Sequence, residues 1–96
     1  MNALTLLSDT QHQIRPLIEA AIENELRLLE AGLRKTKANL KAFESRYSLT
    51  TPEFLAKYEK DEFKESVDFQ NWIGESRLFD RLSEKIKALR GVRFEN

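Results

Sequence analysis

The feature that most limits the fold is a row of residues, apolar at all but one position, that repeats along the first half of the chain. Successive members are separated by 4, 3, 4, 3, 4, 3 and 4 positions, and they are Ile22, Leu26, Leu29, Leu33, Thr36, Leu40, Phe43 and Tyr47. This alternation is the heptad pattern of a helix that packs along another helix. The sequence therefore predicts one long helix with a packing stripe on one side.

A second row widens the apolar face of the first half of this helix, and its members are Ile14, Leu17, Ala21 and Leu28. A widened face is typical of a helix that touches more than one neighbour. Pro16 limits where the helix begins, because proline has no amide hydrogen and fits best in a first turn. We therefore expect the long helix to run from about residue 12 to residue 47.

Two further helices follow a break at residues 48–51. Thr51 is the expected N-cap of a short helix over about residues 52–60, with Pro52 in its first turn and Glu53 favourably placed at its amino end. A third helix is expected over about residues 66–90, with Gly91 as its terminator. Its inward positions repeat at 3 and 4, and they are Trp72, Glu75, Phe79, Leu82, Ile86 and Leu89.

The stripes of the first and third helices need each other for burial, so we expect a single all-α domain over residues 1–96. The predicted architecture is an antiparallel, coiled-coil-like helical hairpin with the short helix at the bend. Counting back from the turn places Trp72 level with the stretch from Gly32 to Thr36. The chain ends, at Leu4–Leu7 and Val92–Phe94, are left open between strand and irregular backbone.

Composition restricts the class of protein. The 96 residues include no cysteine, which excludes disulfides and thiolate metal sites, and 16 basic residues balance 16 acidic ones. A neutral chain offers no overall field for nucleic acid or an anionic membrane. The first residues lack the basic start of a signal peptide, and no apolar run is long enough for a membrane span. We therefore expect a cytoplasmic location and no direct nucleic-acid binding.

A hairpin of this size leaves part of the wide stripe uncovered, which predicts association with another chain. Charge along the long helix is segregated, with acidic residues first and basic residues after them: Glu19, Glu23, Glu25, Glu30, then Arg34, Lys35, Lys37, Lys41. Two copies side by side would match acidic with basic halves only if they ran in opposite directions. The sequence therefore favours an antiparallel homodimer of this helix.

Few residues suggest chemistry. His12 is the only histidine, and we interpret it as a surface residue because no second ligand of its kind exists. Asp61, Glu65 and Asp68 would share one helix face, where they could hold a divalent cation, but the interleaved lysines favour a solvated face. No phosphate loop, nucleophile elbow or dinucleotide fingerprint occurs. We expect no enzyme activity, no metal and no cofactor.

Two segments resemble a known family. The first is Arg46-Tyr47-Ser48-Leu49-Thr50-Thr51-Pro52-Glu53-Phe54, and the second, after a mixed acidic linker, is Asp68-Phe69-Gln70-Asn71-Trp72. They are similar to the "K-Y-G-(M/L)-(S/T)-x-E-E-F" turn and the "D-F-x-x-W" helix start of small prokaryotic all-helical proteins regarded as antitoxins, encoded beside a small toxin. Ser48 stands in place of the family's glycine, and the linker here carries Lys60 and Lys64. The match covers roughly the second half of the chain.

The resemblance implies an antitoxin-like role, in which the hairpin binds a cognate toxin and neutralises it by covering its active site. An amphipathic stripe suits such helix-in-groove binding. The expected partner-binding residues are Ile22, Leu26, Leu29, Leu33, Leu40 and Phe43. The alternative hypothesis is a self-associating structural protein, a scaffold whose only partner is a second copy of itself.

Overall fold

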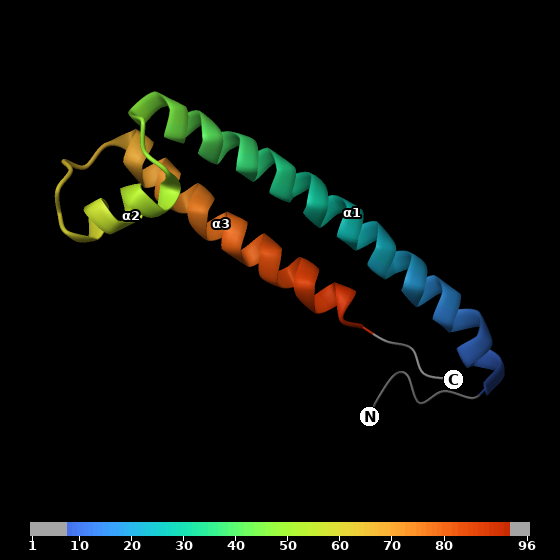
Figure 1. Cartoon of the computed structure of the whole chain (residues 1–96). Helices are drawn as coiled ribbons and strands as arrows, with labels where there is room; N and C mark the ends of the chain where they lie inside the picture. The colour runs from blue at the N-terminus through green and yellow to red at the C-terminus, as the bar shows by residue number, and fades with distance from the viewer. Residues whose placement is uncertain (1–7, 93–96) are drawn as a thin grey trace.

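Three helices make up the fold. The computed structural model of the protein describes residues 8–92, with side chains from residue 12 onward. Helix α1 spans Ser8–Tyr47, α2 spans Thr51–Glu59 and α3 spans Val67–Arg90. α1 and α3 lie side by side in opposite directions, and α2 folds beneath the end where they are joined (Figure 1). The predicted all-α hairpin is confirmed, and the described residues contain no strand. Residues 1–7 and 93–96, on which most of the two chain-end expectations fall, lie outside them.

The molecule is a rod. Its radius of gyration is 19.6 Å and its principal extents are 61 × 24 × 20 Å, whereas a compact domain of this length has a radius of gyration of about 12 Å. A rod two helices thick has little interior, and among the described residues the fully buried large side chains are Trp72 and Phe54. Both lie near the joined end, so the core is concentrated there.

The start of α1 differs from the expected one. α1 begins at Ser8, about four residues early, and Pro16 lies inside it. Proline keeps a helical φ of about −65° and removes one backbone hydrogen bond, so a helix can continue past it with a bend. Figure 1 shows the first turns of α1 curving away from the axis of the rest. The expectation of a start near residues 12–16 was wrong because proline only disfavours, and does not prevent, a preceding turn.

The end of α1 is formed by Ser48, which has a φ of 55°, in the left-handed region that favours glycine. The amide of Leu49 then donates to the carbonyl oxygen of Glu44 at 3.3 Å and satisfies one of the last free carbonyl groups of the helix. Ser48 is the position at which the resembled turn carries glycine. Ser48 is therefore held in a left-handed backbone conformation that is unfavourable for any residue with a side chain.

Replacing Ser48 with glycine is therefore expected to raise the free energy of unfolding by about 1 kcal/mol, because glycine adopts the left-handed conformation without a steric penalty. Urea denaturation followed by circular dichroism measures the change. Ser48→Ala is the matched control, since alanine removes the hydroxyl but keeps the penalty. Equal midpoints for the glycine and alanine variants would show that the conformation at this residue carries no strain.

Helix α2 is capped by a reciprocal pair. The hydroxyl oxygen of Thr50 accepts a hydrogen bond from the amide of Glu53 at 3.2 Å, and the Glu53 carboxylate accepts one from the amide of Thr50 at 2.9 Å. The hydrogen bond from the Thr50 amide to the carboxylate, together with the nearby Thr50 side chain, lowers the pKa of Glu53. The expected cap, Thr51, was wrong by one residue: its hydroxyl instead accepts a hydrogen bond from the indole nitrogen of Trp72 at 3.0 Å.

Helix α3 begins and ends at capping residues. Ser66 precedes it, and its hydroxyl oxygen accepts a hydrogen bond from the amide of Phe69 at 3.1 Å. Gly91 follows it, and its amide donates to the carbonyl oxygens of Lys87 and Ala88, each at 3.2 Å. The expected third helix and its terminator are confirmed to within a residue.

The register between α1 and α3 is fixed by contacts along their length. Gly32 lies against Leu82, Asn39 donates to Glu75 at 3.1 Å, and Phe43 stacks on Trp72 with ring centroids 5.5 Å apart. Trp72 is thus level with Phe43, and the expectation that it faces Gly32–Thr36 was wrong. Because α2 folds under the hairpin and does not lengthen it, α3 starts close to the end of α1.

Candidate interaction surfaces

The joined end of the hairpin, which we call the closed end, is built from aromatic side chains of all three helices and of the loop before α3. Its members are Phe43, Tyr47, Phe54, Tyr58, Phe63, Phe69 and Trp72. Trp72 lies between Phe43 and Phe54, and its ring centroid is 3.9 Å from that of Phe54 with an interplanar angle of 3°. Stacked rings add to the stabilisation provided by burial. The expectation that Trp72 belongs to the core is confirmed, since it is completely buried.

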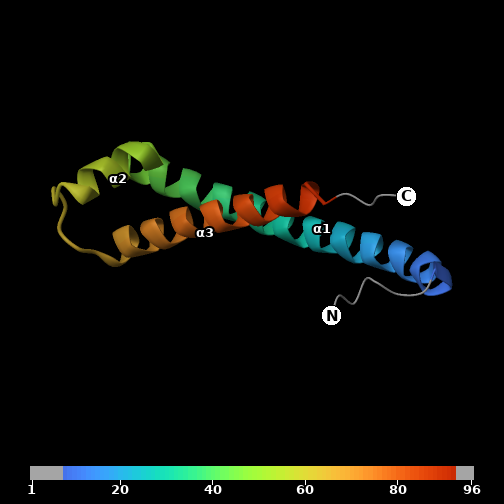
Figure 2. The same cartoon turned by 90° about the horizontal axis from the view of Figure 1, so that it is seen from below.

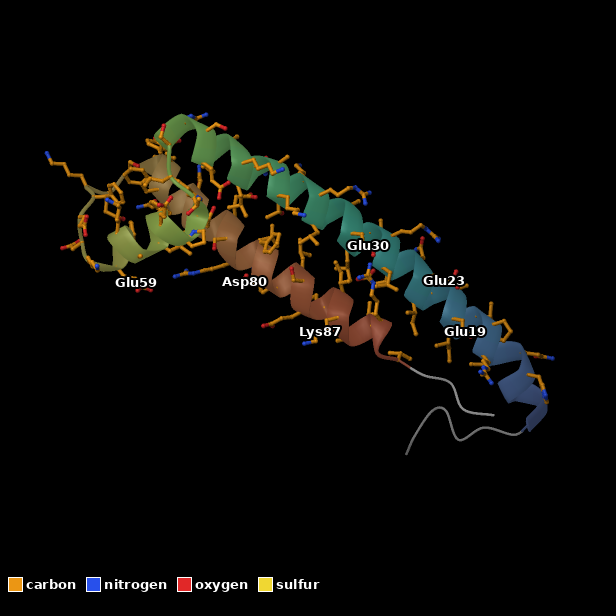
Figure 3. All side chains as sticks on the ribbon, viewed as in Figure 1. Glu19, Glu23, Glu30, Glu59, Asp80 and Lys87 are labelled. Atoms are coloured by element: carbon orange, nitrogen blue, oxygen red, sulfur yellow. The ribbon has the colours of Figure 1, made fainter. Side chains whose placement is uncertain are left out.

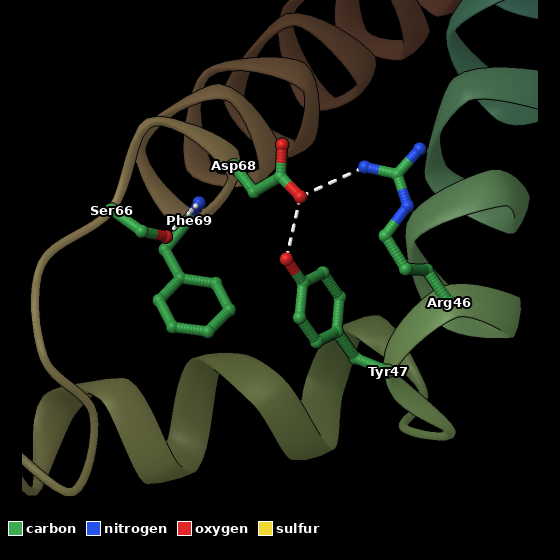
Figure 4. A network of polar contacts seen from close by, with 5 residues as sticks. All are labelled: Arg46, Tyr47, Ser66, Asp68 and Phe69. Atoms are coloured by element: carbon green, nitrogen blue, oxygen red, sulfur yellow. Dashed lines mark hydrogen bonds and ion pairs between the residues drawn. The ribbon is translucent and has the colours of Figure 1, made fainter.

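Asp68, in the first turn of α3, ties the closed end to α1. Its Oδ2 atom accepts hydrogen bonds from the hydroxyl of Tyr47 and, at 2.8 Å, from Nη1 of Arg46 (Figure 4). The bonds from Tyr47 and Arg46 lower the pKa of Asp68, and the same contact raises the pKa of Tyr47. The D-F-x-x-W segment therefore joins helices: its aspartate holds the end of α1 and its tryptophan fills the core.

Replacing Asp68 with asparagine is expected to reduce the dependence of stability on acid pH. The pKa of Asp68 is lowered in the folded state, so its contribution is complete above the unfolded value of about 4 and is lost as pH falls below that. The urea midpoint of the variant should therefore fall less between about pH 5 and pH 2 than that of the parent. Asp80→Asn, at an exposed position of α3, is the control, and parallel curves for Asp68→Asn and the parent would contradict the assignment.

The acidic candidates do not form a metal site. Residues 60–66 lie between α2 and α3, so the expected helix face shared by Asp61, Glu65 and Asp68 was wrong. Glu65 accepts hydrogen bonds from the hydroxyl of Tyr58 and from the side-chain amide of Gln70, and Asp68 is held by Tyr47 and Arg46. Across the described part of the chain, no group of three or more metal-binding side chains is found.

Two further expectations concern the surface. His12 is exposed on α1, in agreement with its interpretation as a surface residue. None of the helices formed by the described residues is long and apolar enough to cross a membrane.

The expected partner-binding residues fall into two groups. Leu29, 8% exposed, and Phe43, stacked on Trp72, are used by the hairpin itself. Leu33 and Leu40 are half-buried along the same helix, whereas Ile22 and Leu26 lie half-buried where α3 ends. Within one hairpin most of the heptad stripe therefore packs against α3, and its amino-terminal members remain within reach of another chain.

α1 extends well past the end of α3 (Figure 2). Continuing the register places Arg90, the last residue of α3, level with about residue 24 of α1, so residues 8–24 project over about 25 Å. We call this segment the overhang. The heptad stripe enters it at Ile22, whose preceding heptad position is Glu19, and Ile18 and Ile14 lie four and eight residues before Ile22; all three isoleucine side chains are partly buried. An apolar face that extends beyond its own partner helix is a candidate docking surface.

A second apolar feature lies on a different side of α1. Leu28 is 62% exposed although its neighbour Leu29 is buried, because adjacent residues of a helix point about 100° apart. Leu17 shares the side of Leu28 and is 69% exposed. The second row noticed in the sequence is therefore not covered by α3. The sequence predicted that this half of the helix touches more than one neighbour, and the burial of each residue now separates the row from the α3 contact.

Two shallow surface hollows accompany these features. One lies between α1 and α3 near the closed end and has a mixed lining, with polar side chains such as Asn39 and Arg46 beside Ala42 and Phe43. The other lies at the end of α3 and is lined mainly by apolar surface around Ala88, Gly91 and Val92. Both are open, so neither has the enclosed form typical of a small-molecule site.

Comparisons with known proteins find no matching protein family, no matching curated protein and no matching solved structure.

Proposed function

We propose that this chain is a protein-binding module, not an enzyme, and that the overhang of α1 is its docking surface. The observation that carries the proposal is the row of partly buried isoleucines, Ile14, Ile18 and Ile22, on a helix that extends beyond α3. Apolar side chains four residues apart lie along one side of a helix, which is the form that a hydrophobic groove on a partner recognises. The closed end then holds the three helices together, so that the overhang projects from a folded hairpin.

The partner that we propose to test first is a small toxin. The support is the resemblance of the turn at Tyr47–Phe54 and of the Asp68–Trp72 helix start to helical antitoxins. Those residues build the closed end, and the overhang would enter the active-site cleft of the toxin and cover it. A helix that fills a catalytic cleft blocks access to it and needs no catalytic residue of its own.

The experiment is growth rescue by co-expression. The chain is expressed with a small protein encoded beside its own gene, and rescue from growth arrest is compared between the parent and Ile18→Glu/Ile22→Glu. Loss of rescue is expected for this variant because two carboxylates cannot enter an apolar groove without a large desolvation penalty. Ala56→Glu, at an exposed position of α2, is the control and should rescue fully.

Two outcomes would overturn the proposal. If the neighbouring protein does not arrest growth, the antitoxin role is wrong. If the double variant rescues as well as Ala56→Glu while both fold, the overhang is not the docking surface. Circular dichroism checks the folding of both variants.

A further inference from the structure

The exposed row on α1 is longer than the two leucines suggest. Counting from Leu17 in steps of 4, 3, 4, 3, 4, 3 and 4 reaches seven further residues, and every one of the eight side chains is exposed: Leu17, Ala21, Asn24, Leu28, Ala31, Lys35, Ala38 and Ala42. This is a complete second heptad row over 26 residues. We call it the lateral seam. It lies about 100° around α1 from the buried stripe, as the pair Leu28 and Leu29 shows.

We propose that a second copy of this chain packs along the lateral seam, antiparallel, with the two Leu28 side chains meeting at the two-fold axis. The inference goes beyond the proposed partner, because Ile18 and Ile22 lie within about 40° of the buried stripe and outside the row of eight, whereas Ile14, three residues before Leu17, stands at the edge of that row. The occupant is identified by the charges along α1 and by the sizes of the seam residues.

The charges favour an antiparallel pair. The stretch 17–25 carries Glu19, Glu23 and Glu25 and no basic residue, while the stretch 31–42 carries four basic residues and no acidic one. Figure 3 shows Glu19 and Glu23 along the overhang, apart from the middle of the helix. With Leu28 at the axis, each acidic stretch lies beside the basic stretch of the other copy, and Glu23 comes level with residue 33, one position from Arg34. A parallel pair would place like charges together, which is unfavourable.

The side-chain sizes fit the same register. In a pair centred on Leu28, the large Leu17 comes level with the small residues Ala38 and Ala42 of the other copy. Leucine opposite alanine lets two helices approach closely and interdigitate, which is the packing of knobs into holes. In this arrangement the two Arg27 side chains, which carry like charges, approach each other near the axis. Each Arg27 already donates a hydrogen bond to Asn24 of its own chain at 3.3 Å.

The first test is the oligomeric state of the full chain in solution, measured by light scattering over a dilution series. A dimer is expected for the parent. Leu28→Glu should raise the dissociation constant of the dimer at least about tenfold, because it places two carboxylates opposite each other at the axis. Ala56→Glu adds the same charge on α2 and should leave the dimer intact. A monomeric parent, or a Leu28→Glu variant as dimeric as the control, would overturn the proposal.

The second test fixes direction and register, and it uses the absence of cysteine from the chain. Under mild oxidation, Leu28→Cys should form a disulfide-linked dimer, whereas Leu17→Cys should not, because its two copies would be about 33 Å apart. The double variant Leu17→Cys/Ala38→Cys should become cross-linked. Efficient cross-linking of Leu17→Cys alone would show a parallel pair and refute the arrangement. Neither test involves a toxin, so failure here is distinct from failure of the proposed function.

Discussion

Replacing Trp72 with alanine is expected to lower the free energy of unfolding by about 3–5 kcal/mol, the largest effect of any single substitution in this chain. The side chain is 0% exposed and is stacked between Phe43 and Phe54. Its indole N–H also donates to Thr51, so truncation leaves a cavity between all three helices. A domain of this size has a total stability of about 5–15 kcal/mol at most. The variant should therefore be largely unfolded well below the melting temperature of the parent.

Urea denaturation followed by circular dichroism at 222 nm measures this change, since the chain has one tryptophan and the variant loses its fluorescence. Trp72→Phe is the matched control. It keeps an aromatic ring between Phe43 and Phe54 but loses the bond to Thr51, and a smaller loss is expected. A Trp72→Ala variant within about 1 kcal/mol of the parent would show that the closed end is not the core of the fold.

The second large effect is expected near the carboxyl-terminal end of α3, away from the closed end. Ile86 is 5% exposed and lies level with Leu29, which is 8% exposed. Ile86→Ala should lower stability by about 2–5 kcal/mol, because it leaves a cavity in the buried apolar contact that holds this part of the rod together. The loss should be local. Hydrogen exchange should increase in the last turns of α3 and around Leu29, while the amides near Trp72 stay protected.

Lys87→Ala is the control for this experiment. Lys87 is the exposed neighbour of Ile86 on the same helix (Figure 3), and its replacement should leave both stability and exchange close to those of the parent. If Ile86→Ala instead raised exchange uniformly along both helices, the hairpin would unfold as a single cooperative unit. The closed end and the opposite end of the hairpin, where α3 stops, would then not differ in local stability.

The helices could be predicted from the sequence because their limits are set by local signals. Pro52, Ser66 and Gly91 act through their own backbone geometry and hydrogen bonds, and these do not depend on the rest of the fold. The predicted spans of α2 and α3 agree with the structure to within a residue or so. The choice between Thr50 and Thr51 as the cap had a local signal that the prediction missed, the Thr50-x-x-Glu53 spacing of a capping box, while the hydroxyl of Thr51 accepts the bond from Trp72.

The register could not be predicted in the same way. It depends on where the segment between α1 and α3 goes, and sequence patterns do not show that α2 folds back under the hairpin. An extended connection would have placed Trp72 opposite Gly32–Thr36, whereas the folded one places it opposite Phe43. The wrong register also prevented the prediction of the overhang, because the length of the overhang follows directly from the register. The lateral seam was visible as a second row of apolar residues, but only burial separates it from the stripe that faces α3.

The closed end also has a consequence for how the chain folds. The residues that meet there, from Phe43 to Trp72, are separated by fewer than 30 positions, and α2 lies between them. Closing so short a loop has a small entropic cost, and the aromatic stacking that forms in return buries Trp72 and Phe54 completely. We expect the folding nucleus to form here, after which α1 and α3 pair turn by turn toward the open end. The overhang is reached last, so the segment proposed to meet a partner is also the one that folding stabilises least.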